Sequence, residues 1–117
     1  STSPSRPKSD TTLTFFPARL EQEFADWTAT FPDHIRDGLN QLLTDATQGA
    51  RVDSKPINIE KKMFELRLVG FGCRIYCTRT KNNEFVVLGF GPKESQKHDI
   101  LTAHSRFRHL SAGSAAA

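Results

Sequence analysis

The sequence predicts an α+β fold in a single small domain, in which two helices precede an antiparallel sheet and one helix follows it. Three observations support this prediction. The chain has 117 residues, which is enough for one hydrophobic core. Apolar residues recur at helical spacing in the first half of the chain and alternate with polar residues in the second half.

The predicted domain covers residues 12–110. Residues 1–11 are rich in Ser and Pro and have no hydrophobic periodicity, so we expect a disordered lead-in. Residues 111–117 contain only Ser, Ala and Gly and are interpreted as a linker or a cloning remnant.

A short strand is predicted at residues 12–16, where Pro17 ends a β-prone run. Two amphipathic helices are predicted next, one after Pro17 and one between Pro32 and Gly49. Their apolar residues recur at intervals of three and four: Leu20, Phe24, Trp27 and Phe31 in the first helix, then Ile35, Leu39, Leu42, Leu43 and Ala46 in the second. Because the two helices are adjacent, we expect an antiparallel helix hairpin.

Three strands are predicted in the second half, at residues 63–69, 73–79 and 84–90, with turns at 70–72 and 81–83. They form an antiparallel meander, and the strand at 12–16 could extend it at either edge to four strands. Ser95 is the predicted N-cap of a last helix that contains Ile100, Leu101, His104 and Phe107. We expect all the helices to pack on one face of the sheet.

Charge is distributed unevenly along the chain. Residues 1–60 carry six basic and nine acidic side chains, whereas residues 61–109 carry ten basic and four acidic ones. This asymmetry indicates an anionic partner for the second half, with nucleic acid as the first candidate. No apolar run approaches the ~20 residues that a membrane-spanning helix needs, so no membrane partner is expected.

The two cysteines, Cys73 and Cys77, lie in one predicted strand, on the same face but too far apart to form a disulfide. No histidine is spaced to complete a zinc site with them. We therefore expect two reduced thiols that pack as small hydrophobic side chains, which suits the cytoplasm.

Period-two alternation gathers polar side chains on one face of the meander, which we expect to be open to solvent. On this face lie Glu65, Arg67, Arg74 and Tyr76. Further charged or titratable side chains flank it, with Lys61 and Lys62 before the first strand of the meander and Lys93 and His98 after the third.

Such a set suits the cleavage of RNA without a metal ion or other cofactor. Cations stabilise the negative charge that grows on the phosphate, while a base and an acid transfer the protons. Glu65 or His98 could act as base or acid, and Tyr76 could do so if nearby cations lower its pKa. The alternative is structural, because a Glu and an Arg on neighbouring strands commonly form a cross-strand ion pair.

Four segments of the second half resemble a known family of proteins. These are Phe64-Glu65-Leu66-Arg67, Gly72-Cys73-Arg74-Ile75-Tyr76, Val86-Val87-Leu88-Gly89-Phe90-Gly91-Pro92-Lys93 and Asp99-Ile100-Leu101-Thr102-Ala103. In order and spacing they resemble the RelE/HigB superfamily of toxins from type II toxin–antitoxin systems, closest to its phage-derived "addiction module killer" branch. The resemblance covers about residues 13–107.

The resemblance implies a RelE-like fold, similar to microbial ribonucleases, and a ribosome-dependent mRNA interferase that arrests growth and is neutralised by a cognate antitoxin in a hetero-oligomer. Carried over by position, Arg74 contacts the scissile phosphate, Lys93 is the basic residue after the last strand, and His98 or Asp99 lies near the general acid. The expected RNA-binding residues are Arg67, Lys61, Lys62 and Arg79.

Two other functions stay open on the same fold. One is a non-enzymatic inhibitor that resembles ParE-type toxins, which bind DNA gyrase. The other is a member without catalytic activity that binds RNA or protein.

Overall fold

A computed structural model describes residues 12–57, 62–68, 70–80 and 84–116. The elements are β1 (Thr12–Phe15), α1 (Leu20–Ala29), α2 (Asp33–Thr47), β2 (Ser54–Pro56), β3 (Met63–Leu68), β4 (Cys73–Arg79), β5 (Glu84–Pro92), the 3₁₀ helix η2 (Lys93–Ser95) and α3 (Gln96–Ala116). The α+β class is thus confirmed. The lead-in at 1–11 and the turn at 81–83 lie outside the described residues, while α3 extends into the segment expected to be a linker.

The strands form one mixed sheet in the order β1-β5-β4-β3-β2. Its centre is the predicted meander, in which β4 pairs antiparallel with both β3 and β5. β1 joins the edge of the sheet parallel to β5, after which the helix hairpin carries the chain away from that edge. The polar strand β2, which the sequence did not predict, pairs with β3 at the other edge.

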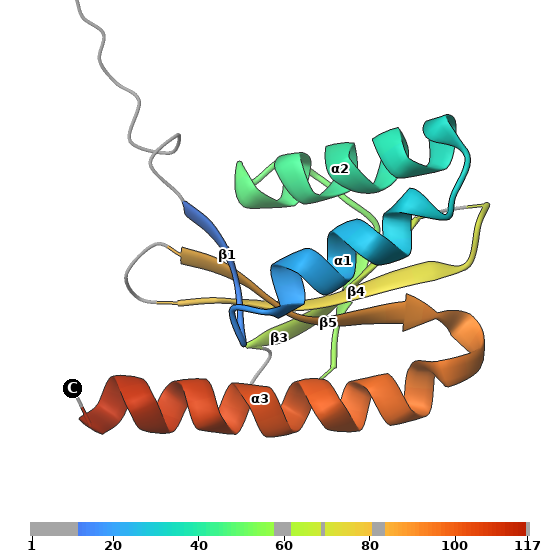
Figure 1. Ribbon diagram of the computed structural model, residues 1–117. Coiled ribbons are helices and arrows are strands. Elements are labelled where there is room, and N and C mark those ends of the chain that lie inside the picture. The colour runs from blue at the N-terminus through green and yellow to red at the C-terminus, as the bar shows by residue number, and fades with distance from the viewer. Residues whose placement is uncertain (1–11, 58–61, 69, 81–83, 117) are drawn as a thin grey trace, which may run out of the picture.

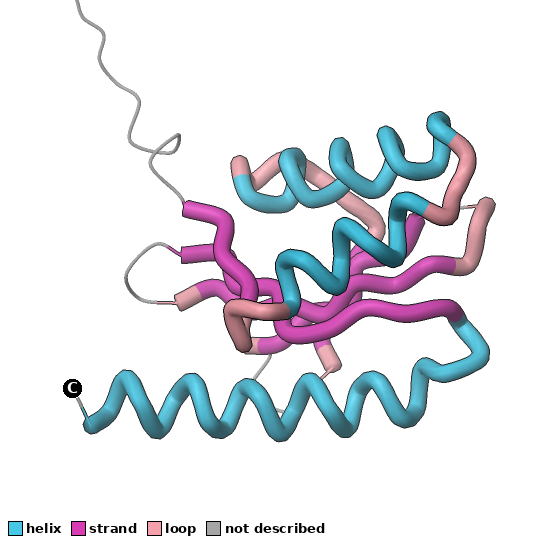
Figure 2. The backbone as a smooth tube through the Cα atoms, in the orientation of Figure 1, coloured by secondary structure: helices cyan, strands magenta, loops and turns pink. Residues whose placement is uncertain are grey.

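Helices cover both faces of this sheet. Figure 1 shows α1 and α2 on one face and α3 along the other, and Figure 2 shows the same three layers. The expectation that all helices pack on one face is therefore wrong. The reason is that the second face is also apolar, since Met63, Tyr76, Val86 and Leu88 form a separate core with Ala103 of α3. A continuous apolar run such as residues 85–88 is typical of a strand buried on both faces.

The helix hairpin buries the apolar stripes that the sequence predicted. Trp27 of α1 stacks on Phe90 of β5 with ring centroids 4.8 Å apart, and Phe24 meets the same ring edge-on at 5.1 Å. Leu39 of α2 is completely buried in this core. These contacts fix the hairpin over the centre of the sheet.

A β-bulge in β5 decides which of its residues face α3. Tyr76 pairs with Gly89 and Cys77 pairs with Val87, so Leu88 is an extra residue in the ladder. The Leu88 carbonyl accepts a 2.9 Å hydrogen bond from Nη1 of Arg106 in α3. The bulge directs Leu88 and Gly89 to the same face and turns Phe90 toward the helix hairpin.

The sheet-facing stripe of α3 differs in one respect from the predicted one. Ile100 and Phe107 pack against the sheet as expected, together with Ala103 and Leu110. Leu101, by contrast, is 66% exposed on the outer side of the helix.

Candidate nucleic-acid interface

The face of the meander that we expected to be open is covered by α3. Glu65 and Tyr76 are completely buried, and the side chain of Arg74 is only 12% exposed. Alternation along the strands does bring the three residues together, because Glu65 lies opposite Tyr76 in the ladder and Arg74 is two residues away on the same face. They therefore form a cluster inside the protein and not an accessible surface.

Glu65 is the centre of this cluster. Its Oε2 lies 3.5 Å from Nε of Arg74, an ion-pair distance at which no hydrogen bond is formed. Its Oε1 accepts a 2.7 Å hydrogen bond from Nε2 of Gln96, the first residue of α3. The cross-strand ion pair that the sequence left open as an alternative is present, and Gln96 extends it to the helix.

The environment of Tyr76 raises the pKa of its phenol, whereas a role in acid–base catalysis requires a lowered pKa. Burial is the main cause that raises the pKa of its phenol, and the negative charges of Glu65 and Asp99 raise it further, whereas Arg74 acts in the other direction. Among the described residues, the Tyr76 hydroxyl has no hydrogen-bond partner. The phenol therefore stays protonated at neutral pH and cannot serve as a base.

Arg67 and Arg74 face each other across the β3–β4 ladder, at the end of the sheet next to the Gly70–Gly72 turn. Like charges in this position repel each other, and each arginine has its own carboxylate partner. Nη2 of Arg67 donates a 2.8 Å hydrogen bond to Oδ1 of Asp53, in the segment before β2. The Arg67 side chain is 38% exposed, so it reaches solvent to a greater extent than Arg74.

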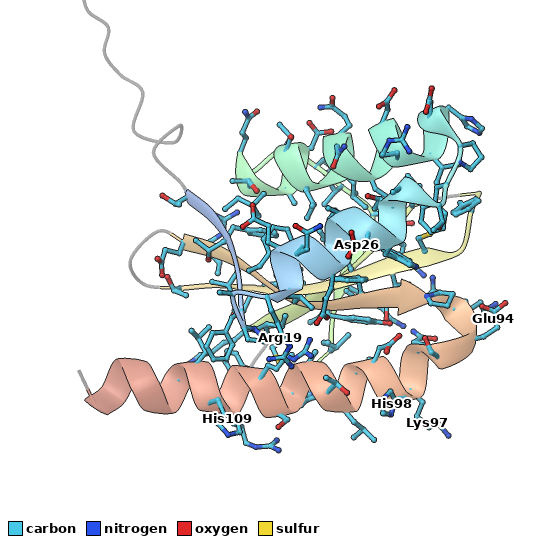
Figure 3. The ribbon with its side chains drawn as sticks, in the orientation of Figure 1. Arg19, Asp26, Glu94, Lys97, His98 and His109 are labelled. Carbon is cyan, nitrogen blue, oxygen red and sulfur yellow. The ribbon has the colours of Figure 1, made fainter. Side chains whose placement is uncertain are left out.

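Three exposed basic side chains follow β5 at the same end of the sheet. Pro92 pairs with Cys73, which places Lys93 of η2 next to the start of β4. Lys97 and His98 lie in the first turn of α3, and Figure 3 shows both on the side of the helix that points away from the sheet. His98 is thus separated from Glu65 and Tyr76 by the helix itself.

We call Arg67, Arg74, Lys93 and Lys97 the sheet-end cations. The turn from η2 into α3 also holds carboxylates, because Glu94 is exposed and Asp99 is hydrogen-bonded to the Ser95 hydroxyl. Asp99 lies against the backbone of β5, where a Cβ on Gly91 would be 3.1 Å from its Cγ. Asp99 therefore fixes the start of α3 against the sheet.

The remaining residues expected to bind RNA have separate locations. Arg79 points to the helix-hairpin face, where Nη2 donates a 2.9 Å hydrogen bond to the Ala46 carbonyl near the end of α2 and the guanidinium lies over the Phe85 ring. Lys62 is exposed next to the start of β3, and its carbonyl accepts a 2.6 Å hydrogen bond from Thr78. Lys61 lies outside the described residues.

Both cysteines are free and buried in the helix-hairpin core, as the sequence predicted. Burial raises the pKa of the Cys77 thiol and also that of Cys73, so both stay protonated at neutral pH. Within the described ranges, no group of three or more His, Cys, Asp or Glu side chains could hold a metal ion.

Sequence reasoning missed Gln96, Asp53 and Asp99 as partners of the charged residues. Gln96 lies 31 positions from Glu65, and Asp53 lies 14 positions from Arg67, so no local pattern links them. An acidic side chain in the first turn of a helix, such as Asp99, is an ordinary local signal that does not reveal the contact with Gly91.

Comparisons with models of known protein families and with curated proteins found no match to this chain. No helix in the described part of the chain is both long and apolar enough to span a membrane. Chemically, Arg67, Lys93 and Lys97 among the sheet-end cations reach solvent, so each can bind a phosphate group.

Proposed function

We propose that the protein is the toxin of a toxin–antitoxin pair, an endonuclease that cleaves mRNA on the ribosome without a metal ion and thereby arrests growth. The observation that carries the proposal is the pairing of Arg67 with Arg74 at the end of the sheet where exposed Lys93 follows β5. The resemblance of these segments to the RelE/HigB superfamily supports it, as does a helix hairpin that precedes a three-stranded meander. The implied partners are a cognate antitoxin and ribosome-bound mRNA in the cytoplasm.

The proposed reaction is an in-line displacement at phosphorus. The ribose 2′ oxygen attacks the phosphate and gives its proton to a base, while the 5′ oxygen leaves with a proton from an acid, which yields a 2′,3′-cyclic phosphate and a 5′ hydroxyl. Arg67, Lys93 and Lys97 bind the phosphates and balance the additional negative charge. Of the three groups expected to transfer protons, His98 is the exposed one, so we assign to it the protonation of the departing 5′ oxygen, while solvent water takes the proton of the 2′ hydroxyl.

In this proposal Glu65, Arg74 and Tyr76 are positioning residues. Glu65 holds Arg74 on one side and Gln96 on the other, so the network fixes the first turn of α3 beside the start of β4. That turn carries Lys97 and His98.

A second candidate function is a ParE-like inhibitor that binds DNA gyrase without catalysis. The observation that favours it is the burial of Glu65 and Tyr76, because neither side chain can meet a substrate beneath α3. The charged groups at the sheet end would then contact a protein partner.

Primer extension on a translated reporter mRNA, after induction of the protein, tests the proposal. The wild type is expected to produce new 5′ ends only when ribosomes translate the reporter, and Lys93→Ala to lose most of them. Arg108→Ala is the matched control, because Arg108 is exposed on α3 about 16 Å along the helix from Lys97. Arg74→Ala is less suitable, since it leaves the buried Glu65 without its cation and destabilises the fold. Intact mRNA during growth arrest, accompanied by gyrase-linked DNA breaks, would replace this function with the second candidate.

A further inference from the structure

The two edges of the sheet differ in their protection against pairing with another strand. β2, at one edge, is three residues long and contains Lys55 and Pro56, which are features that keep an edge strand unpaired. β1, at the other edge, contains neither a charged residue nor a proline, and its Leu13 is 38% exposed. Among the described residues no strand lies beyond β1, so its outer edge is open to a further strand.

The register of β1 shows which of its backbone groups point outward. Phe15 is the register partner of Val87, and the Phe16 amide donates a 3.0 Å hydrogen bond to the Val87 carbonyl. In a parallel ladder a residue bonds to the two neighbours of its register partner, so Thr14 and Phe16 turn their N–H and C=O groups toward β5. Leu13 and Phe15 therefore direct theirs to the open edge.

The side chains of Leu13 and Phe15 lie on the helix-hairpin face, beside a cleft of about 460 Å³. Phe24 of α1 and Leu43 of α2 are among the residues of its other walls. A strand added to β1 would place alternate side chains on this face next to Leu13 and Phe15. The open edge thus fits an uncharged strand with apolar residues two positions apart, and β1 is itself such a strand.

We propose that β1 pairs antiparallel with β1 of a second copy of the chain, across a two-fold axis at Thr14. This register places Leu13 opposite Phe15 of the second copy, and each such pair exchanges both of its N–H···O bonds because these groups point outward. A two-fold axis perpendicular to the sheet keeps each face on its own side, so Leu13 and Phe15 of both copies meet on the helix-hairpin face. No like charges meet within the pair of strands, because β1 has none.

The chain's own residues 1–11 do not supply a strand of this kind. Their sequence contains Pro4 and Pro7, which cannot donate to a ladder, and it has no apolar side chain larger than proline. A second copy of β1, by contrast, offers the required alternation of apolar residues.

The proposed interface is separate from the proposed RNA site. β1 pairs with Glu84–Val87 in the first half of β5, whereas Lys93 follows the last residue of that strand. Dimer formation and RNA cleavage are therefore independent properties, and loss of one in a variant leaves the other unchanged.

Analytical ultracentrifugation over a concentration series tests the pairing. The wild type is expected to approach twice the mass of one chain as its concentration rises, and Leu13→Lys to sediment as a monomer, because a charge on an edge strand opposes pairing. Leu101→Lys is the matched control that leaves the dimer intact, since Leu101 is 66% exposed on the outer side of α3. Denaturation midpoints show that both variants are folded. A wild type that is monomeric at every concentration, or a dimer that persists in Leu13→Lys, overturns the proposal.

A single introduced cysteine tests the register. Thr14 would lie opposite Thr14 of the second copy with Cα atoms ~4.5 Å apart, so Thr14→Cys is expected to form a disulfide-linked dimer on oxidation with copper phenanthroline. Thr12→Cys is the control, because residue 12 and its copy would lie four positions apart along the strands, about 14 Å. Thr12 is the more exposed of the two, so random collision would favour the opposite result. Cross-linking of Thr12→Cys that equals or exceeds that of Thr14→Cys contradicts the two-fold pairing at Thr14.

Discussion

Gln96, the first residue of α3, donates a 2.7 Å hydrogen bond to the buried carboxylate of Glu65 in the middle of β3. This bond joins the last helix to the central meander through the same carboxylate that pairs with Arg74. A charged group in the interior is costly unless it is paired, so Glu65, Arg74 and Gln96 depend on one another.

Removal of the Glu65 carboxylate is expected to destabilise the protein strongly. Glu65→Ala leaves Arg74 buried without its partner, and we expect the free energy of unfolding to fall by about 3–5 kcal/mol. The double variant Glu65→Met with Arg74→Met removes both charges and should lose much less. Urea denaturation measures both values. Equal losses in the two variants would show that side-chain packing, and not charge pairing, holds this region together.

Tyr76→Phe is expected to make the protein more resistant to alkaline pH. The folded protein holds the phenol proton to a higher pH than the unfolded chain, whose tyrosine has a pKa of ~10. The stabilising contribution is therefore complete below about pH 10 and is lost as the pH rises further. Cys73 and Cys77 act in the same direction, so the comparison with Tyr76→Phe isolates the phenol.

The chain has one tyrosine, so tyrosinate absorbance reports Tyr76 directly during an alkaline titration. The absorbance is expected to rise only as the protein unfolds. Ionisation of Tyr76 in the folded protein near its ordinary pKa would contradict the buried environment. Loss of mRNA cleavage in a folded Tyr76→Phe variant would make the phenol a proton-transfer group and not a positioning residue.

A disulfide between α3 and β5 tests whether the helix must move for activity. A Cβ at Gly89 would lie 3.9 Å from that of Ala103, which is within the range that a disulfide spans. Gly89→Cys with Ala103→Cys is expected to form the bond and to stabilise the fold by about 3 kcal/mol. Since the groups assigned to RNA lie outside this interface, cleavage should continue in the oxidised protein. Cleavage that stops on oxidation and returns with reductant would show that α3 opens during the reaction.

Gly91→Ala is expected to disturb the start of α3. The added Cβ would lie 3.0 Å from the Ser95 hydroxyl oxygen and 3.1 Å from Cγ of Asp99, closer than packed atoms normally approach. We expect a loss of about 1–3 kcal/mol in the free energy of unfolding. Adding Asp99→Ala removes the contact and should recover part of the loss, which a double-mutant cycle measures as a coupling energy. Strictly additive effects would contradict this contact.

The helix hairpin and the meander could be predicted from the sequence because they depend on local periodicity. The stripe through Leu20 and Phe24 is buried, and the strand containing Ile75 has the predicted limits. β2 could not be predicted, because the exposed segment Ser54–Pro56 has no apolar pattern and is held by its pairing with β3.

Alternation placed Glu65, Arg74 and Tyr76 on one face correctly, but it does not show whether another element covers that face. Burial of this face beneath another element could have been expected, because Met63, Val86 and Leu88 make the same face apolar. The orientation of Phe90 could not be derived from strict alternation, because the bulge at Leu88 shifts the period. Gly89, within an otherwise apolar strand, was the available signal of a bulge.

The bulge at Leu88 limits how the length of β5 can change. Deletion of this one residue would restore a regular ladder in which Phe90 still lies opposite Ile75, but it would remove the Leu88 side chain from the core beneath α3 and the carbonyl that accepts the Arg106 hydrogen bond. Insertion of one residue between Gly89 and Phe90 would instead move Phe90 opposite Arg74, into the space occupied by α3, and leave a cavity beside Trp27. The length of this strand is therefore constrained by two cores at once.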